Sequence, residues 1–189
     1  MIPRLLAISP PGGPALAAWL SSAPERVAAG ADALLLRVFG GPVRSEDYAD
    51  LAATGAVVIV HQRTVGVQGI HVHLASSEDP VAWRPRVPGL LGVSCHGPAD
   101  LLRAAAAGCD YATLSPIFSP GSKPDDTRDP LGPSALREAP LPVLALGGSG
   151  PGNVSACLEA GAHGVAGIGA FSAIEAVAAM VAERDRCSR

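Results

Sequence analysis

The chain has 189 residues and a net charge of −3 at pH 7, and its residues are 48% hydrophobic but only 4% aromatic. This length suits one sizeable domain, and a core built mainly from Ala, Val, Leu and Ile is typical of buried parallel strands. A single lysine and an acidic balance argue against a nucleic-acid surface, which needs a clustered excess of basic residues. No apolar run approaches the roughly 18 residues of a membrane span. We therefore expect one cytoplasmic α/β domain over residues 1–189, with no nucleic-acid or membrane partner.

The four cysteines are scattered, and none of them forms a CxxC pair. They are Cys95, Cys109, Cys157 and Cys187. Metal sites and disulfide frameworks require closer and more regular spacing, so we expect free thiols in the core.

The first part of the chain alternates between strand and helix patterns. Strands are predicted over 5–9 and 31–39, and helices over 14–30 and 45–55. Ser45 is a favourable residue to begin the second helix, and Gly55 is a favourable residue to end it. Two βα units are therefore expected before residue 56.

The next two predicted strands lie unusually close together in the sequence. They cover 56–61 and 70–74, and only the segment QRTVGVQG separates them. A parallel crossover that contains a helix needs at least about ten to twelve residues. We therefore expect the helix between the third and fourth strands to be reduced or missing.

The same alternation continues to the end of the chain. In order we expect a short helix over 76–84, strand 90–96, helix 97–108, strand 109–118, a long polar loop 119–132, a brief helix 133–139, strand 142–148, helix 151–161, strand 164–171 and helix 172–186. Eight strands with intervening helices predict a single-domain (β/α)₈ TIM barrel. An open doubly wound sheet is the alternative, but PPGG at 10–13 is not the GxGxxG turn that such a sheet usually carries after its first strand.

In a barrel of this kind the functional groups lie at the C-terminal ends of the strands. Candidate binding groups there are Arg37, Arg63, Ser94, Ser115 to Lys123, Gly147, Gly148 and Gly167 to Gly169. Glycines let the backbone approach an anion, and N–H groups at the start of a helix favour negative charge. The pattern indicates a phosphate site, although paired glycines after a strand also occur for tight packing alone.

Three histidines are expected near the same mouth and are candidates for proton transfer. They are His61, His73 and His96, and histidine suits this role because its usual pKa is near neutral. His71 and His73 share one face of a strand, so at least one of them is open to a structural interpretation.

The two arginines at the mouth, Arg37 and Arg63, are costly at the ends of apolar strands unless they meet an anion or a carboxylate. A bound anion and a salt bridge to Glu78 or Asp79 are equally open explanations.

Four stretches resemble the thiamine phosphate synthase/TenI superfamily of TIM barrels, in the same order and at similar spacing. They are GVSCH, CDYATLSPIFSPGSKP, PVLALGG and AGAHGVAGIGAF. The resemblance implies that Ser122 and Lys123 contact phosphoryl groups. It also implies that Gly147, Gly148 and the 167–169 turn offer N–H groups to a thiazole phosphate.

The chain departs from the family pattern at several positions. Of the polar residues that end the family's second strand, Arg37 alone is retained. Gln62 and Glu78 stand where the family has two magnesium-binding aspartates, so Glu78 is the one metal ligand left and we expect little dependence on Mg²⁺. Pro116 stands where TenI proteins have an acid/base histidine, and Pro120 replaces a threonine of the phosphate loop.

The resemblance implies a thiamine-biosynthesis enzyme that binds a small-molecule thiazole phosphate. Two activities stay open: joining of a pyrimidine methyl diphosphate to the thiazole phosphate with loss of diphosphate, and TenI-type aromatisation of a thiazole carboxylate phosphate by proton transfer. A non-catalytic binder or regulator is an alternative, and a sugar-phosphate isomerase ranks last because no strand-end acidic base is identified. The sequence leaves the oligomeric state open, with a homodimer among the states considered.

Overall fold

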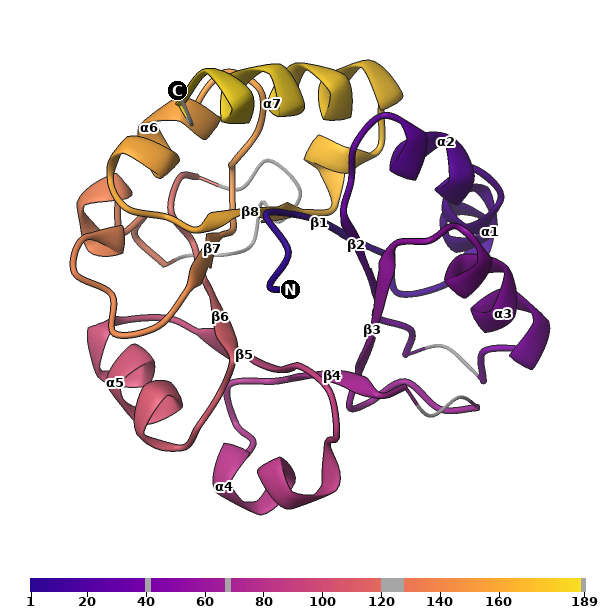
Figure 1. The fold of residues 1–189 in the computed structure, drawn as a ribbon, viewed down its shortest axis with the longest axis horizontal. Helices are drawn as coiled ribbons and strands as arrows, with labels where there is room; N and C mark the ends of the chain where they lie inside the picture. The colour runs from indigo at the N-terminus through magenta and orange to yellow at the C-terminus, as the bar shows by residue number, and fades with distance from the viewer. Residues whose placement is uncertain (40–41, 67–68, 120–127, 188–189) are drawn as a thin grey trace.

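Eight parallel strands close into a barrel, and helices surround it (Figure 1). The structure is a computed structural model that describes residues 1–39, 42–66, 69–119 and 128–187. The strands are β1 (Leu5–Ile8), β2 (Ala33–Leu36), β3 (Val57–His61), β4 (His71–Leu74), β5 (Leu91–Cys95), β6 (Tyr111–Leu114), β7 (Val143–Ala145) and β8 (Gly164–Gly167). Each strand pairs with the next, and β8 pairs with β1 in the register Ala166↔Leu6. The predicted (β/α)₈ TIM barrel is confirmed.

The helices follow most of the strands in the order expected for this fold. They are α1 (Gly13–Ser21), α2 (Ala23–Ala28), α3 (Ser45–Ala53), α4 (Pro80–Trp83), α5 (Pro98–Ala106), α6 (Val154–Glu159) and α7 (Ile174–Cys187), with the 3₁₀ turns η1 (Arg84–Arg86), η2 (Pro133–Leu136) and η3 (Gly169–Phe171).

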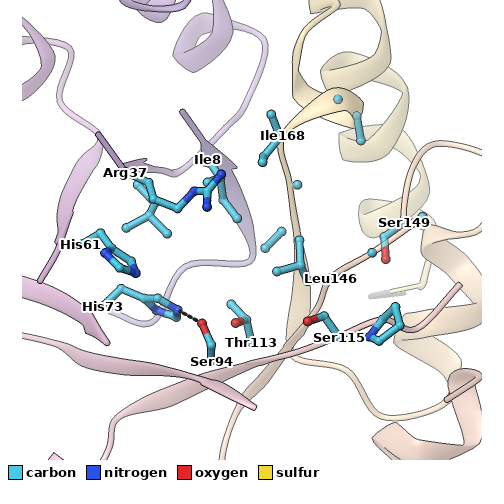
Figure 2. Close-up of a pocket in the computed structure, with 18 of the residues that line it drawn as sticks. Ile8, Arg37, His61, His73, Ser94, Thr113, Ser115, Leu146, Ser149 and Ile168 are labelled. Atoms are coloured by element: carbon cyan, nitrogen blue, oxygen red, sulfur yellow. Dashed lines mark hydrogen bonds between the residues drawn. The ribbon is translucent and has the colours of Figure 1, made fainter. Parts of the chain in front are cut away.

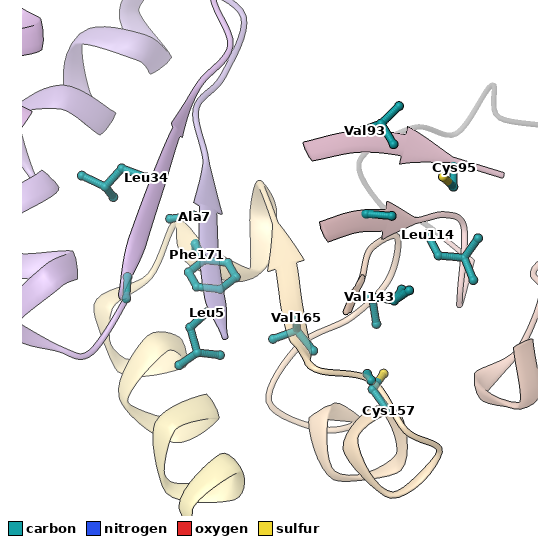
Figure 3. Close-up of a cluster of buried hydrophobic side chains, with 14 of the residues drawn as sticks. Leu5, Ala7, Leu34, Val93, Cys95, Leu114, Val143, Cys157, Val165 and Phe171 are labelled. Atoms are coloured by element: carbon teal, nitrogen blue, oxygen red, sulfur yellow. The ribbon is translucent and has the colours of Figure 1, made fainter. Parts of the chain in front are cut away.

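The alternation of side chains along each strand produces two apolar layers. Leu6 and Leu35 belong to the cluster inside the barrel. Leu5, Val165 and Phe171 belong to the larger layer between the strands and the helices (Figure 3). Successive strand residues point to opposite faces of a sheet, so both layers follow from the near-continuous apolar strands.

The described residues between β3 and β4 form no helix, as the short connection predicted. Gln62 N–H donates to the carbonyl of His73, 3.1 Å away. A Cβ added at Gly69 would lie 2.6 Å from Val60 Cγ2, so this part of the connection runs directly against β3.

Two predicted helices differ from the structure. The helix predicted over 14–30 divides at Ser22 into α1 and α2, because α2 has proline in its first turn and proline cannot continue a helix from the preceding residues. The helix predicted over 133–139 is reduced to the single turn η2. The chain is extended at Arg137 and has a positive φ of 54° at Glu138.

The four cysteines are free thiols, and Cys187 alone among them is exposed.

Candidate active site

A cavity of about 780 Å³ opens at the C-terminal ends of the strands. Ile8, Leu35 and Leu146 contribute apolar surface to it. The described lining also includes ten of the residues predicted from sequence: Arg37, His61, Arg63, His73, Ser94, His96, Gly147, Gly148, Gly167 and Gly169. Glu78 does not line this cavity, and Ser122 and Lys123 lie outside the described residues.

The first of two glycine turns at the mouth follows β7. Gly147 and Gly148 have positive φ values of 87° and 66°, which favour glycine. A Cβ at Gly148 would lie 2.7 Å from Phe118 Cβ and 2.8 Å from the carbonyl oxygen of Ser119. The backbone N–H of Phe118 donates to the carbonyl of Gly147 at 2.9 Å. The segment after β6 therefore packs tightly against this turn and holds it.

The second glycine turn follows β8 and includes the start of η3. No described residue accepts a hydrogen bond from the N–H groups of Gly169 and Ala170. A Cβ at Gly169 would meet nothing within 4 Å, and a Cβ at Gly150 would lie 3.7 Å from Ala170 Cβ. The turns 147–150 and 167–170 therefore adjoin. We call them together the glycine wall.

The opposite side of the cavity, from β2 to β4, carries long polar side chains. Figure 2 shows Arg37, His61 and His73 facing Leu146 and Ile168 across the cavity. We call Arg37, His61, Arg63 and His73 the side-chain wall.

The surroundings of Arg37 suit the binding of an anion. Its guanidinium lies over the Phe39 ring, 5.1 Å from the ring centroid. Its Nε atom is buried and has no hydrogen-bond partner among the described residues. None of the ion pairs between described residues joins Arg37 to Glu78 or Asp79. Burial lowers the pKa of Arg37, and a bound anion would offset that effect.

The two buried histidines of the side-chain wall are neutral at pH 7. Burial, together with the charges of Arg37 and Arg63, lowers the pKa of His61 to about 4. Burial, followed by the effects of His61 and Arg37, lowers the pKa of His73 to about 3. The His73 ring nitrogens lie 3.0 Å from Tyr111 Oη and 3.1 Å from Ser94 Oγ, and these two contacts fix the ring. Figure 2 shows the contact with Ser94.

His96 and His71, which also lie in or beside barrel strands, have different surroundings. His96 is exposed, and its Nδ1 is 2.9 Å from the carbonyl oxygen of Ser115 and 2.6 Å from Nη1 of Arg128. His71 Nδ1 accepts a hydrogen bond from Leu90 N–H at 2.8 Å, which is the structural role left open for one of the β4 histidines.

The described residues do not fit a magnesium ion at the cavity. Mg²⁺ prefers carboxylate oxygens, and no Asp or Glu is among the described lining residues. The Glu78 carboxylate instead accepts hydrogen bonds from Trp83 Nε1 at 3.1 Å and from Gln62 Nε2 at 3.5 Å. A group of three His, Cys, Asp or Glu residues that is placed to hold a metal is likewise absent from the described part of the chain.

Two polar residues of β6 belong to the site but were not predicted from the sequence. Tyr111 is fully buried and contacts His73, and Thr113 lines the cavity with a buried Oγ1 that has no partner among the described residues. The available signal was their spacing of two, which places both hydroxyls on the inward face of a strand that is otherwise apolar.

A protein-family model described as thiamine monophosphate synthase matches residues 28–171. The chain belongs to this family. The predicted superfamily resemblance is confirmed.

Curated relatives in this family carry the name thiamine-phosphate synthase. The protein from Methanoculleus marisnigri is 42% identical over 128 residues, which cover 61% of this chain and 59% of the relative. The protein from Geobacillus kaustophilus is 32% identical over 164 residues, which cover 82% and 69%. The chain spans 26% of the bifunctional ThiM/ThiE protein of Symbiobacterium thermophilum and 62% of the Chloroflexus aurantiacus synthase.

Solved structures share the fold of this family member at low sequence identity. The thiamine phosphate pyrophosphorylase of Pyrococcus furiosus superposes with a TM-score of 0.78 at 21% identity, over 97% of this chain and 96% of the other. Phosphoribosyl anthranilate isomerase of Thermotoga maritima has a TM-score of 0.67 at 15% identity, over 98% and 100%. Within the described ranges, none of the helices is long and apolar enough to cross a membrane.

Proposed function

We propose that this member of the thiamine monophosphate synthase family binds a thiazole phosphate in the mouth cavity and joins it to a pyrimidine methyl diphosphate. The observation that carries the proposal is the opposition of two walls in one cavity. One wall offers backbone N–H groups, the other offers guanidinium groups, and no described carboxylate lies between them.

The phosphate of the thiazole is assigned to the glycine wall. The N–H groups of Gly169 and Ala170 are available, and the absence of a side chain at Gly169 lets an anion approach the backbone. Apolar residues beside this wall, including Leu146 and Ile168, suit the thiazole ring.

The diphosphate is assigned to the side-chain wall. In the reaction, the lone pair of the thiazole nitrogen forms a C–N bond to the pyrimidine methylene carbon. The C–O bond to the diphosphate breaks, and the diphosphate leaves with the bonding electrons. Arg37 and Arg63 would stabilise the negative charge that grows on the leaving group, since guanidinium forks match phosphate oxygens. In this proposal the arginines neutralise charge that a metal ion would otherwise neutralise.

A thiazole tautomerase is the second candidate, and the histidine pair favours it. His61 and His73 are neutral, and their ring centroids lie 6.3 Å apart beside the cavity. A neutral imidazole accepts a proton, which a tautomerase requires and the synthase reaction does not. Pro116 lines the cavity at the position where the resemblance places the TenI histidine, so His61 or His73 would have to supply the proton transfer.

Calorimetric titration with thiazole phosphate, then with pyrimidine diphosphate, followed by a product assay, tests the proposal. The proposal predicts binding of both and formation of thiamine phosphate. Binding of thiazole phosphate alone, together with aromatisation of a thiazole carboxylate phosphate in a separate assay, would establish the tautomerase. Gly169→Ala adds a methyl group to open space at the cavity and should weaken thiazole-phosphate binding. The matched control is Gly152→Ala, which also meets nothing within 4 Å but does not line the cavity. Equal affinity of the two variants would contradict the phosphate assignment.

A further inference from the structure

Arg26 is a buried arginine behind the glycine wall. It belongs to α2 and is 1% exposed. Its Nε donates to the carbonyl of Phe171 at 2.7 Å, its Nη1 to the carbonyl of Trp19 at 3.1 Å, and its Nη2 to Ser22 Oγ at 3.0 Å. The guanidinium also lies 5.1 Å from the centroid of the Trp19 ring. It therefore ties the junction of α1 and α2 to the last residue of η3.

The charge of Arg26 has no carboxylate partner in the described structure. Its three hydrogen-bond acceptors are two backbone carbonyls and a hydroxyl, all of them neutral. Burial lowers its pKa, and the adjacent Glu25 raises it by a smaller amount. A buried, unpaired charge is costly, which makes Arg26 a candidate for a role beyond packing.

A chain of hydrogen bonds leads from Arg26 to the cavity. The peptide that joins Phe171 to Ser172 accepts from Arg26 at its carbonyl and donates from Ser172 N–H to the carbonyl of Gly169 at 3.1 Å. The peptide that joins Gly169 to Ala170 then has its N–H group on the opposite side, since carbonyl and N–H point in opposite directions across a trans peptide. Ala170 lines the cavity, and no described residue accepts from its N–H.

Hydrogen bonds in series polarise one another, and a charged donor at the start of the series strengthens the effect. Each link from the guanidinium therefore makes the next N–H group a better donor. The last donor in the series is the Ala170 N–H group.

We propose that Arg26 is a positioning residue for phosphate binding, which holds the Gly169–Ala170 turn from behind and polarises the Ala170 N–H group toward the anion. The identity of the ligand in this proposal rests on the proposed function. The hydrogen-bond series does not depend on it. A purely structural arginine would stabilise the fold, and its removal would change the affinities for the phosphorylated and the unphosphorylated ligand by the same factor.

The test compares Arg26→Met with Arg84→Met. Arg84 is a matched control because it too binds backbone carbonyls, those of Val87 and Gly89, and it pairs with Asp110 at the other end of the barrel. Amide proton shifts of Ser172 and Ala170 are measured by NMR in the ligand-free proteins. Dissociation constants are then measured for thiazole phosphate and for the unphosphorylated thiazole alcohol.

Arg26→Met should move the Ser172 and Ala170 amide proton signals upfield. It should weaken the binding of thiazole phosphate by about tenfold and leave the affinity for the thiazole alcohol unchanged. Arg84→Met should change neither the two shifts nor the ratio of the two affinities. Unchanged shifts, or an equal loss for both ligands, would overturn the proposal. If Arg26→Met does not fold, Arg26→Lys, which keeps the charge with fewer hydrogen bonds, is judged by the same affinity ratio. Failure of the wild type to bind thiazole phosphate would overturn the proposed function alone, since the ligand-free amide shifts still test the hydrogen-bond series.

Discussion

The two walls of the mouth present opposite solutions for holding an anion. The glycine wall offers backbone N–H groups, and the segment after β6 packs tightly against its turn at Gly147 and Gly148. The side-chain wall offers Arg37 and Arg63, one half-buried and the other exposed, together with two buried neutral histidines.

Because of this difference, the two walls should respond to different changes in the protein and its solution. Backbone N–H groups carry no titratable charge, so the glycine wall itself does not titrate, and binding there depends on the geometry and polarisation of its N–H groups and on the charge of the ligand. The side-chain wall depends on charge, so it responds to removal of a guanidinium and to protonation of its histidines.

The largest effect is expected from Gly148→Ala. The new Cβ would require a left-handed conformation and would lie 2.7 Å from Phe118 Cβ. Backbone strain and overpacking together should lower the free energy of unfolding by about 4 kcal/mol. Urea denaturation measures this, with Gly152→Ala expected within about 0.5 kcal/mol of the wild type. A Gly148→Ala protein as stable as the control would show that the turn is not held tightly.

Removal of one guanidinium should affect the side-chain wall alone. Arg37→Met is expected to weaken the binding of inorganic diphosphate by about 50-fold, because a charge-assisted contact is lost. The affinity for thiazole phosphate should change by less than about twofold. Isothermal titration measures both affinities. The control is Arg44→Met, because Arg44 is exposed, pairs with Asp47 and does not line the cavity. A similar loss for both ligands would mean that the two walls do not divide the anions as proposed.

Acid should destabilise the protein through the side-chain wall. The pKa values of His61 and His73 are about 4 and about 3 in the folded state and near 6.5 when unfolded, so the unfolded chain binds more protons between these values. Stability is therefore complete above about pH 6.5 and is lost as the pH falls, by about 2 kcal/mol for each of the two histidines at pH 5. Urea denaturation at pH 7 and pH 5 measures the change, which His61→Gln/His73→Gln should reduce. An equal change in the double variant would assign the acid sensitivity to other groups.

Magnesium should have the smallest effect. Because no described carboxylate lines the cavity, Mg²⁺ is expected to change diphosphate affinity by less than about threefold. Titration in Mg²⁺ and in EDTA measures this, with Glu78→Gln as the variant that removes the remaining family ligand. A strong magnesium dependence that Glu78→Gln abolishes would contradict the assignment of the diphosphate to arginines.

The fold was largely predictable from sequence because the strands are continuous apolar runs with glycine or proline between them. The missing helix after β3 followed from the length of the connection alone. The break at Ser22 had a signal in Pro24, which the apolar pattern of 14–30 obscured. The single turn η2 had none, because its end depends on the backbone conformations of Arg137 and Glu138.

The membership of the cavity was also predictable, since strand ends meet at one mouth in any parallel barrel. The hydrogen-bond partners and the protonation states of the cavity residues were not predictable. The sequence allowed Arg37 to pair with an acid, and only the folded chain places it over Phe39 with Nε unpartnered among the described residues. The fixed orientation of His73 depends on its spatial neighbours Tyr111 and Ser94. Arg26 falls within a predicted helix, and nothing in the helical pattern predicted that it is buried.

A crystal structure with thiazole phosphate and inorganic diphosphate bound together tests the division between the two walls most directly. We expect the thiazole phosphate group within hydrogen-bond distance of the Gly169 and Ala170 N–H groups, and the diphosphate against Arg37. A thiazole phosphate group bound to Arg37, with the glycine wall empty, would contradict this division.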